Sequence, residues 1–286
     1  MNNTFNIKRF GLTMRKDFIE NGKRYLFLFV TLLGLITVAI TFMTWEYYLN
    51  VEASKTIEPS FFLFHNKNLL TFLSFTFLAA GIWFSSTFTA PMNSKLKRIT
   101  YLISPASNLE KYLTRWIITT MGFIVAFFAA MWIADAIRVA LCSMRYPEIE
   151  IKFLDLSKLY YPDKIFINSD SMVPKGVFQF FLSLYFLFQS IFLLGSTYWE
   201  KASFIKTFTF GAVITAAFIL ICRWTILLFY GSLDGYGNVM SSFEINHTIS
   251  EEQAVTIAAI VLAVFTLTFW VLAYFRMKES EIIKRF

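Results

Sequence analysis

The chain has 286 residues, of which 57% are hydrophobic and 16% are charged, and its formal net charge is +7. Soluble domains carry about a quarter charged residues, so this composition excludes an ordinary soluble globular domain. Two cysteines, Cys142 and Cys222, are too few to define a disulfide framework.

The apolar residues are concentrated in six runs that are each long enough to cross a bilayer. The runs cover residues 25–45, 69–89, 116–134, 177–199, 207–230 and 254–275. Five contain no Lys, Arg, Asp or Glu, and the fifth in order contains only Arg223. We therefore predict an all-α polytopic membrane protein with six transmembrane helices.

The distribution of basic residues predicts how the chain is oriented in the membrane. Residues 1–24, 90–115, 200–206 and 276–286 hold 17 Lys and Arg, whereas the segments on the opposite side, 46–68, 135–176 and 231–253, hold 8. By the positive-inside rule, both termini are expected in the cytoplasm and segment 135–176 is expected outside. This bias accounts for the net charge, so we expect no nucleic-acid partner.

Residues 5–24 precede the first span and have an amphipathic helical pattern. Ile7, Phe10, Met14 and Phe18 follow one another at spacings of three or four residues, which places them on one stripe. A basic amphipathic helix at this position is expected to lie along the inner membrane surface. The alternative is an ordinary charged flank of the first span.

The loop 90–115 contains a break followed by a helix start. Pro105 disfavours helix at Ser104, and Ser107-x-x-Glu110 fits a capping box, in which both side chains satisfy free backbone N–H groups. A competing start has Pro105 at the first helical position. We expect a short polar helix just before the third span.

Arg223 is the one charged residue inside a predicted span. Counted from the predicted cytoplasmic ends at ~1.5 Å per residue, Arg223 lies about 24 Å and Asp135 about 28 Å along their helices. We therefore predict an intramembrane pair of Asp135 and Arg223. Two alternatives are a local pair of Asp135 with Arg138, and an Arg223 that extends to the outer interface.

The sequence contains no recognisable catalytic or cofactor motif. A phosphate-binding G-x-x-x-x-G-K-[ST] loop, a G-x-S-x-G nucleophile motif and an H-E-x-x-H metal motif are all missing from the chain. We expect no catalytic residue, metal or cofactor in this chain.

The stretch Leu102-Ile103-Ser104-Pro105-Ala106-Ser107-Asn108-Leu109-Glu110 resembles the "L-P-x-S-R/N-x-E" type sequence of the ABC-2 type permease family, with two residues inserted between the leucine and the proline. The six-span plan is similar as well. Two features depart from the family pattern: the 42-residue segment after the third span is long, and no re-entrant hydrophobic helix follows the fifth.

The resemblance implies a non-enzymatic subunit of an exporter in a bacterial inner membrane. A separate ATP-binding-cassette ATPase would bind ATP and Mg²⁺, and a second permease copy or a related chain would complete a dimer. Residues 1–24 would form the connecting helix and 90–115 the coupling loop of the domain 25–275, followed by a cytoplasmic tail, 276–286. Contact with the ATPase would fall on Pro105, Ser107, Asn108, Glu110 and Lys111.

Three other functions stay open at this stage. The chain could be a non-transporting membrane sensor or assembly subunit that acts through segment 135–176. A channel or a membrane enzyme are further alternatives. The sequence does not define a transported substrate.

Overall fold

The computed structural model describes residues 5–54, 59–92, 99, 101, 103–147, 151–154, 177–199, 201–230 and 251–283. This part of the chain is helical and contains no strand. Six of its helices are long and apolar enough to cross a membrane, which confirms the all-α, six-span prediction.

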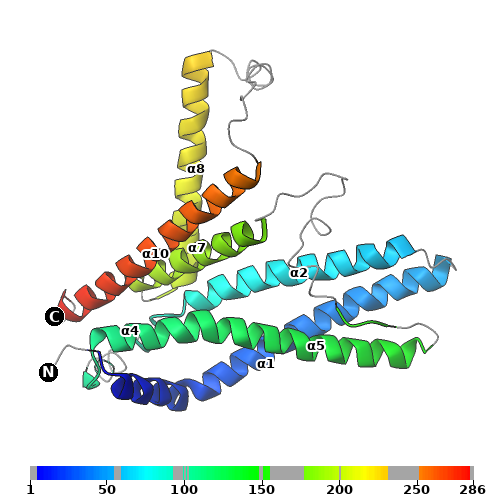
Figure 1. The fold of residues 1–286 in the computed structure, drawn as a ribbon, viewed down its shortest axis with the longest axis horizontal. Helices are drawn as coiled ribbons and strands as arrows, with labels where there is room; N and C mark the ends of the chain where they lie inside the picture. Colours follow the sequence, from blue (N-terminus) through cyan, green and yellow to red (C-terminus); the bar gives the residue numbers. More distant parts are fainter. Residues whose placement is uncertain are drawn as a thin grey trace.

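Figure 1 shows the helices, coloured in their order along the chain. They are α1 (Ile7–Ser54), α2 (Pro59–Ser85), the short 3₁₀ turn η1 (Ala90–Met92), α4 (Asn108–Ile117), the π-helical turn η2 (Ile118–Gly122), α5 (Phe123–Arg145), α7 (Val177–Tyr198), α8 (Ser203–Tyr230) and α10 (Glu251–Ile283).

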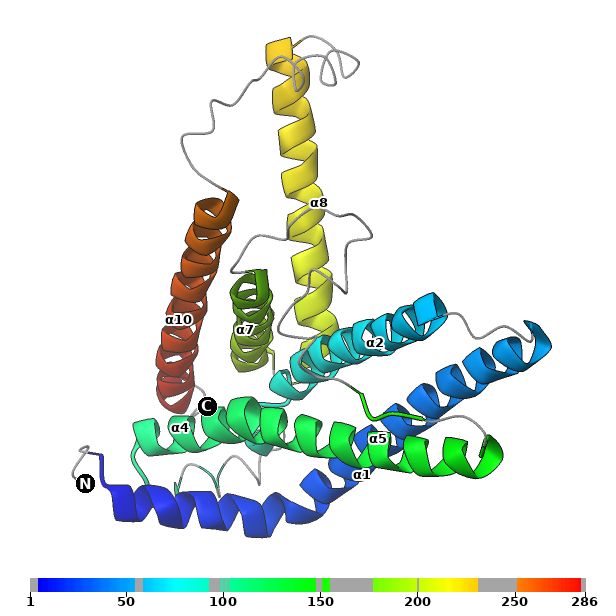
Figure 2. The same cartoon turned by 45° about the vertical axis from the view of Figure 1, so that its right-hand side comes forward.

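The helix is continuous at the predicted starts of the first and the third membrane span. The amphipathic segment 5–24 and the first span belong to one helix, α1, which changes direction along its length in Figure 2. The polar helix α4 likewise continues through η2 into α5, so one continuous helix runs from Asn108 to Arg145 and contains the predicted third span, 116–134. No proline occurs between these two residues to interrupt the backbone hydrogen bonds. A movement at residue 108 is therefore carried by continuous helix into the span.

The helices form two groups that meet where α7 packs on α2 and where α10 packs on α4. Figure 2 shows α1, α2, α4 and α5 in one group, with α7, α8 and α10 standing together against it. Large aromatic side chains fill the contact between the groups. The rings of Phe77 and Tyr185 stack at 4.4 Å, and those of Trp116 and Trp270 meet edge to face at 4.9 Å.

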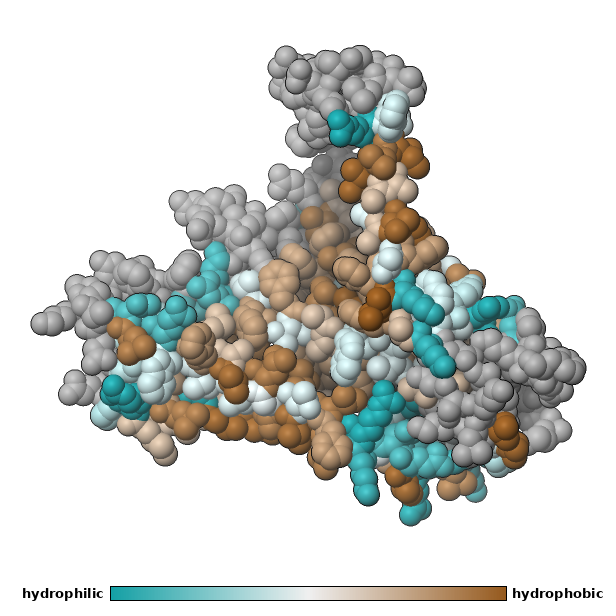
Figure 3. All heavy atoms as spheres, turned by 180° about the vertical axis from the view of Figure 1, so that it is seen from behind, coloured by the Kyte–Doolittle hydropathy of each residue, from teal (hydrophilic) through white to brown (hydrophobic). Residues whose placement is uncertain are grey.

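Apolar side chains also cover most of the outer surface. Figure 3 shows brown, hydrophobic atoms over much of the molecule, including the projecting rod of α8. From residue 212 to 225, every side chain of α8 except Cys222 is exposed. In water such a surface would be unstable, whereas lipid tails solvate it at no cost, as expected for a membrane protein.

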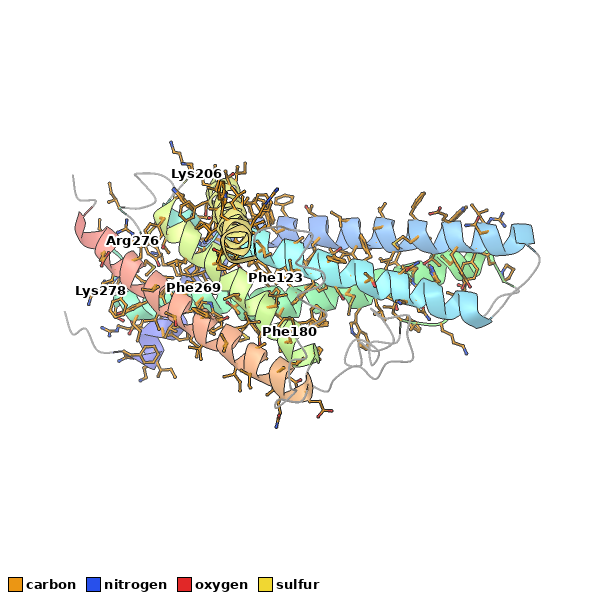
Figure 4. All side chains as sticks on the ribbon, turned by 90° about the horizontal axis from the view of Figure 1, so that it is seen from above. Phe123, Phe180, Lys206, Phe269, Arg276 and Lys278 are labelled. Carbon is orange, nitrogen blue, oxygen red and sulfur yellow. The ribbon has the colours of Figure 1, made fainter. Side chains whose placement is uncertain are left out.

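α7 and α8 form a tight hairpin at the end where Lys206, Arg276 and Lys278 gather in Figure 4. Ala202, between the two helices, has a left-handed φ of 54°. Gly195 of α7 packs directly against the side chain of Thr207, and a β-carbon at this glycine would overlap with Thr207. The missing side chain at Gly195 therefore permits the close approach of the two helices.

We predict that Gly195→Ala destabilises the protein by about 1–3 kcal/mol, because the added methyl group forces the hairpin apart. The measurement is thermal unfolding in mild detergent. Gly211→Ala is the matched control, since nothing lies within 4 Å of a β-carbon at Gly211. Thr207→Ala should restore part of the loss in the Gly195→Ala background, because it removes the two closest atoms of Thr207 but keeps its Cβ at 2.9 Å. Equal melting temperatures for the two alanine variants would contradict the proposed overlap.

Candidate functional site

The candidate site is the junction between the N-terminal part of α1 and the start of α4. Ser107 has an extended backbone, φ −69° and ψ 157°, and caps α4. The Glu110 backbone N–H donates to the Ser107 hydroxyl at 3.3 Å, and the Ser107 backbone N–H donates to the Glu110 carboxylate at 2.9 Å. The predicted capping box is present, and α4 begins at Asn108 rather than at Pro105.

Glu110 joins this cap to α1. Its carboxylate accepts from the backbone N–H of Asn6 at 2.7 Å and from the Arg9 guanidinium at 3.1 Å, in addition to the bond from Ser107. The Glu110 side chain is fully buried, whereas that of Arg9 is one-third exposed. One carboxylate thus satisfies donors from two segments about 100 residues apart.

A second ion pair lies one and a half helical turns further along α4. The Arg115 guanidinium donates to both carboxylate oxygens of Asp17 at 3.0 and 3.2 Å and to the Tyr25 hydroxyl at 2.7 Å. The Tyr25 hydroxyl and the Asn21 side-chain amide also donate to Asp17, at 2.6 and 3.0 Å. Arg115 and Asp17 are both nearly buried, at 6% and 12% side-chain exposure. Three side chains, Asn21, Tyr25 and Arg115, thus donate to this one carboxylate.

The two ion pairs have opposite polarity. In the first pair α1 supplies the cation and α4 the anion, and in the second pair the roles are reversed. If α4 slid along α1 by one pair, like charges would meet in a buried environment and each would lose its partner. Leaving a buried charge unpaired costs about 3–5 kcal/mol. The arrangement therefore selects one register of α4 on α1.

The pKa of Glu110 reflects this environment. Burial alone would raise the pKa of the carboxyl group, but the hydrogen bonds from Ser107 and Asn6, together with the charge of Arg9, hold it below its ordinary value. Glu110 is thus held ionised at neutral pH.

The structure divides the predicted coupling residues into buried and exposed ones. Glu110 and Lys111 are buried, and the Lys111 ammonium lies 5.5 Å from the ring centre of Tyr101. Ser107 and Asn108 are half-buried, and Pro105 is exposed. In this arrangement Glu110 and Lys111 support the helix and cannot contact another protein directly.

Apolar side chains that the sequence analysis did not assign to this site lie on its exposed face. Ile103 is 75% and Leu109 38% exposed, on either side of the exposed Pro105. The capping box gave the position of α4, but the direction of each side chain depends on which face packs against α1. The sequence did contain a signal for Leu109. Adjacent residues of a helix lie on different faces, so the apolar residue next to the capping glutamate is on another face than the glutamate itself.

A chain of hydrogen bonds connects α4 to the second helix group. The Tyr112 hydroxyl donates to the backbone carbonyl of Trp270 at 2.8 Å, and the Trp270 indole N–H donates to the Gln189 side-chain oxygen at 3.1 Å. The Gln189 amide donates to the Thr120 hydroxyl at 3.0 Å. Both Gln189 and Thr120 have no exposed surface. The chain thus leaves α4, passes through α10 and α7, and returns to η2.

Thr120 lies in the π-helical turn η2. Turns of this kind occur mostly as single insertions in α-helices, often at functional positions. The sequence analysis missed Gln189, although a glutamine in the middle of an apolar span is a recognisable signal for a helix–helix contact.

The predicted pair of Asp135 and Arg223 is not formed. Asp135 pairs with Arg138 at 2.7 Å, while Arg223 is exposed on α8. A residue three positions along the same helix is within reach, whereas α8 packs mainly against α7. The pair holds the following segment: Arg138 donates to the carbonyl of Lys152 at 2.9 Å, and the N–H of Leu154 donates to Asp135 at 2.9 Å. Residues 151–154 are thereby fixed to the C-terminal half of α5.

The described residues contain no group of three or more His, Cys, Asp or Glu that could hold a metal ion. Comparisons with protein-family models, with curated proteins and with solved structures return no match.

We predict that Asp17→Asn lowers the melting temperature by about 6–12 °C, because it leaves the Arg115 charge buried without its counter-ion. Lys16→Gln is the matched control. Its partner Glu20 is 3.7 Å away and both side chains are exposed, so the pair contributes at most about 1 kcal/mol. Thermal unfolding in detergent measures both variants. Similar losses in both would show that the Asp17 pair is not energetically special.

Stability should also depend on the protonation of Glu110. The pKa of Glu110 is lower in the folded chain than in the unfolded chain, so the ionised carboxylate stabilises the folded state. This contribution is complete when the pH is above the ordinary glutamate pKa of about 4.3, and it disappears as the pH falls through the pKa of the folded chain. The difference in melting temperature between the wild type and Glu110→Gln should be full above pH ~5 and should shrink below pH ~4. A difference that stays constant across this range would contradict the assignment.

Proposed function

We propose that this chain is the permease subunit of an ABC-2 type exporter, which forms the membrane pathway and is driven by a separate ATPase. The observation that carries the proposal is the construction of α4. One face of this helix is fixed on α1 by two ion pairs whose α4 members, Glu110 and Arg115, are buried, and its other face presents Leu109, next to the exposed Pro105 and Ile103.

A rigid helix with an exposed apolar tip has the properties required of a coupling element. The cap and the ion pairs prevent the tip from fraying, so a push on it moves the helix as a whole. Because α4 continues into α5, and because Tyr112 and Thr120 are tied to α10 and α7, the movement reaches both helix groups. The chain has no phosphate-binding loop of its own, so the energy would come from another subunit.

In this proposal the ATPase meets the exposed residues, and Glu110 acts from within the junction. Glu110→Lys would place a second cation beside Arg9 and would disrupt the junction itself. Exposed positions are therefore the appropriate probes of the interface. The second permease chain, the bacterial inner membrane and the export direction belong to the same proposal and rest on the resemblance of residues 102–110.

The test is affinity purification of the tagged protein from native membranes in mild detergent, with co-eluting proteins identified by mass spectrometry. We expect a stoichiometric partner that carries a phosphate-binding G-x-x-x-x-G-K-[ST] motif. The double variant Ile103→Asp and Leu109→Asp should reduce its recovery at least tenfold, because the apolar contact is replaced by charge.

Met144→Asp is the control. Met144 is 81% exposed but lies 35 residues along the same helix from Leu109, about 50 Å away. This variant should retain the ATPase. A preparation without an ATPase, from membranes in which one is expressed, would contradict the proposal and favour a sensor or assembly subunit.

A further inference from the structure

The N-terminal part of α1 exposes a stripe on the face that is turned away from α4. It consists of Lys8, Leu12, Arg15, Ile19, Lys23 and Leu26, at successive spacings of 4, 3, 4, 4 and 3 residues. These spacings place all six on one side of a helix. We call this set the basic–apolar stripe, because cationic and apolar side chains alternate along it.

The stripe is exposed over its whole length. Leu12, Ile19 and Leu26 have 65%, 73% and 63% of their surface accessible, and the three cations are exposed as well. It differs from the stripe that the sequence predicts, since Phe10 and Met14 are half-buried against the rest of the chain. Ile7 and Phe18, the other two members of the predicted stripe, are exposed and widen the apolar surface beside it.

The charge of the stripe is not neutralised within the described part of the chain. The two acidic residues of this region point elsewhere: Asp17 binds Arg115 in the junction, and Glu20 pairs with Lys16. The side chains of Lys8, Arg15 and Lys23 form no ion pair with any described residue. Figure 3 shows teal side chains beside brown ones along the lower edge, at the end of the molecule where α1 begins. A complementary surface must therefore combine negative charge with an apolar layer.

An anionic phospholipid surface has this combination. Leu and Ile side chains can enter the boundary between headgroups and acyl chains, while Lys and Arg remain at the level of the phosphates. The stripe lies on the same helix as the first membrane span, which holds it near the membrane surface. We propose that the basic–apolar stripe binds anionic phospholipids in preference to zwitterionic ones. This inference does not rest on the proposed transport function.

The test is native mass spectrometry of the full-length protein from detergent micelles that contain equal amounts of phosphatidylglycerol and phosphatidylcholine. The wild type should retain more phosphatidylglycerol. Because each cation near an anionic surface changes the affinity about fivefold, Lys8→Gln, Arg15→Gln and Lys23→Gln together should lower the retained ratio at least tenfold. Arg15→Gln alone should lower it about fivefold and serves where the triple variant folds poorly.

The matched control removes three exposed cations that lie outside α1, Lys201→Gln, Lys206→Gln and Lys278→Gln. It should leave the lipid ratio within about twofold of the wild type. Equal ratios for the stripe variant and the wild type would overturn the proposal. An equal loss in the control would also overturn it, by showing that net charge and not the stripe is responsible. Loss of an acidic protein partner with the stripe variant, at an unchanged lipid ratio, would assign the face to a protein and overturn the lipid assignment.

Discussion

The two ion pairs between α1 and α4 are the constraint on which the rest of the arrangement depends. A buried pair does not by itself make a protein more stable, because the cost of removing both charges from water offsets their attraction. A buried pair instead destabilises the other possible arrangements, because any other register of α4 on α1 leaves a buried charge without a partner. Since the pairs Arg9–Glu110 and Asp17–Arg115 have opposite polarity, only one register satisfies both. The direction in which α4 enters the membrane is fixed by this condition.

The second group of helices is attached to the same continuous helix at two points. Tyr112 and Thr120 are eight residues apart, about 12 Å along the axis, and each is hydrogen-bonded to the α7–α10 pair. One attachment would let the pair pivot about α4, whereas two attachments restrict both rotation and sliding. Burying a glutamine such as Gln189 in an apolar environment costs free energy unless its side chain is hydrogen-bonded. The chain of hydrogen bonds through Gln189 is therefore formed completely or not at all. The polar residues of the spans thus determine how the apolar surfaces are placed against each other.

The sequence predicted the features that depend on local or compositional signals. The six spans follow from the length of the apolar runs, and the cap at Ser107 follows from the three-residue spacing to Glu110. The remainder depends on tertiary packing. Glu110 could not be distinguished from an exposed contact residue, because a capping glutamate can have either role until the position of α1 is known.

The same limit explains the two differences in side-chain assignment. Depth along a helix placed Asp135 and Arg223 at one level, but it contains no information about which helices are neighbours, and the local pair with Arg138 formed instead. On α1, hydrophobicity alone favoured the stripe with Phe10 and Met14. In the structure that side is shared with Arg9 and Asp17, which face α4 because their buried partners lie there.

α8 is attached differently from the other helices, and this difference has a mechanical consequence. Its contacts with α7 lie near its start, where the rings of Phe192 and Phe204 are 5.4 Å apart and those of Trp199 and Phe210 are 5.8 Å apart. Beyond these contacts the helix is exposed on nearly all sides. With 28 residues α8 is about 42 Å long, so a rotation of about 10° at its base would move its far end by roughly 7 Å. Because Gln189 of α7 is hydrogen-bonded to Thr120 of η2, which continues α4, a small tilt of the capped helix would be amplified at the far end of α8. In the proposed permease, the largest displacement would therefore occur at the end of the molecule opposite to the site of coupling.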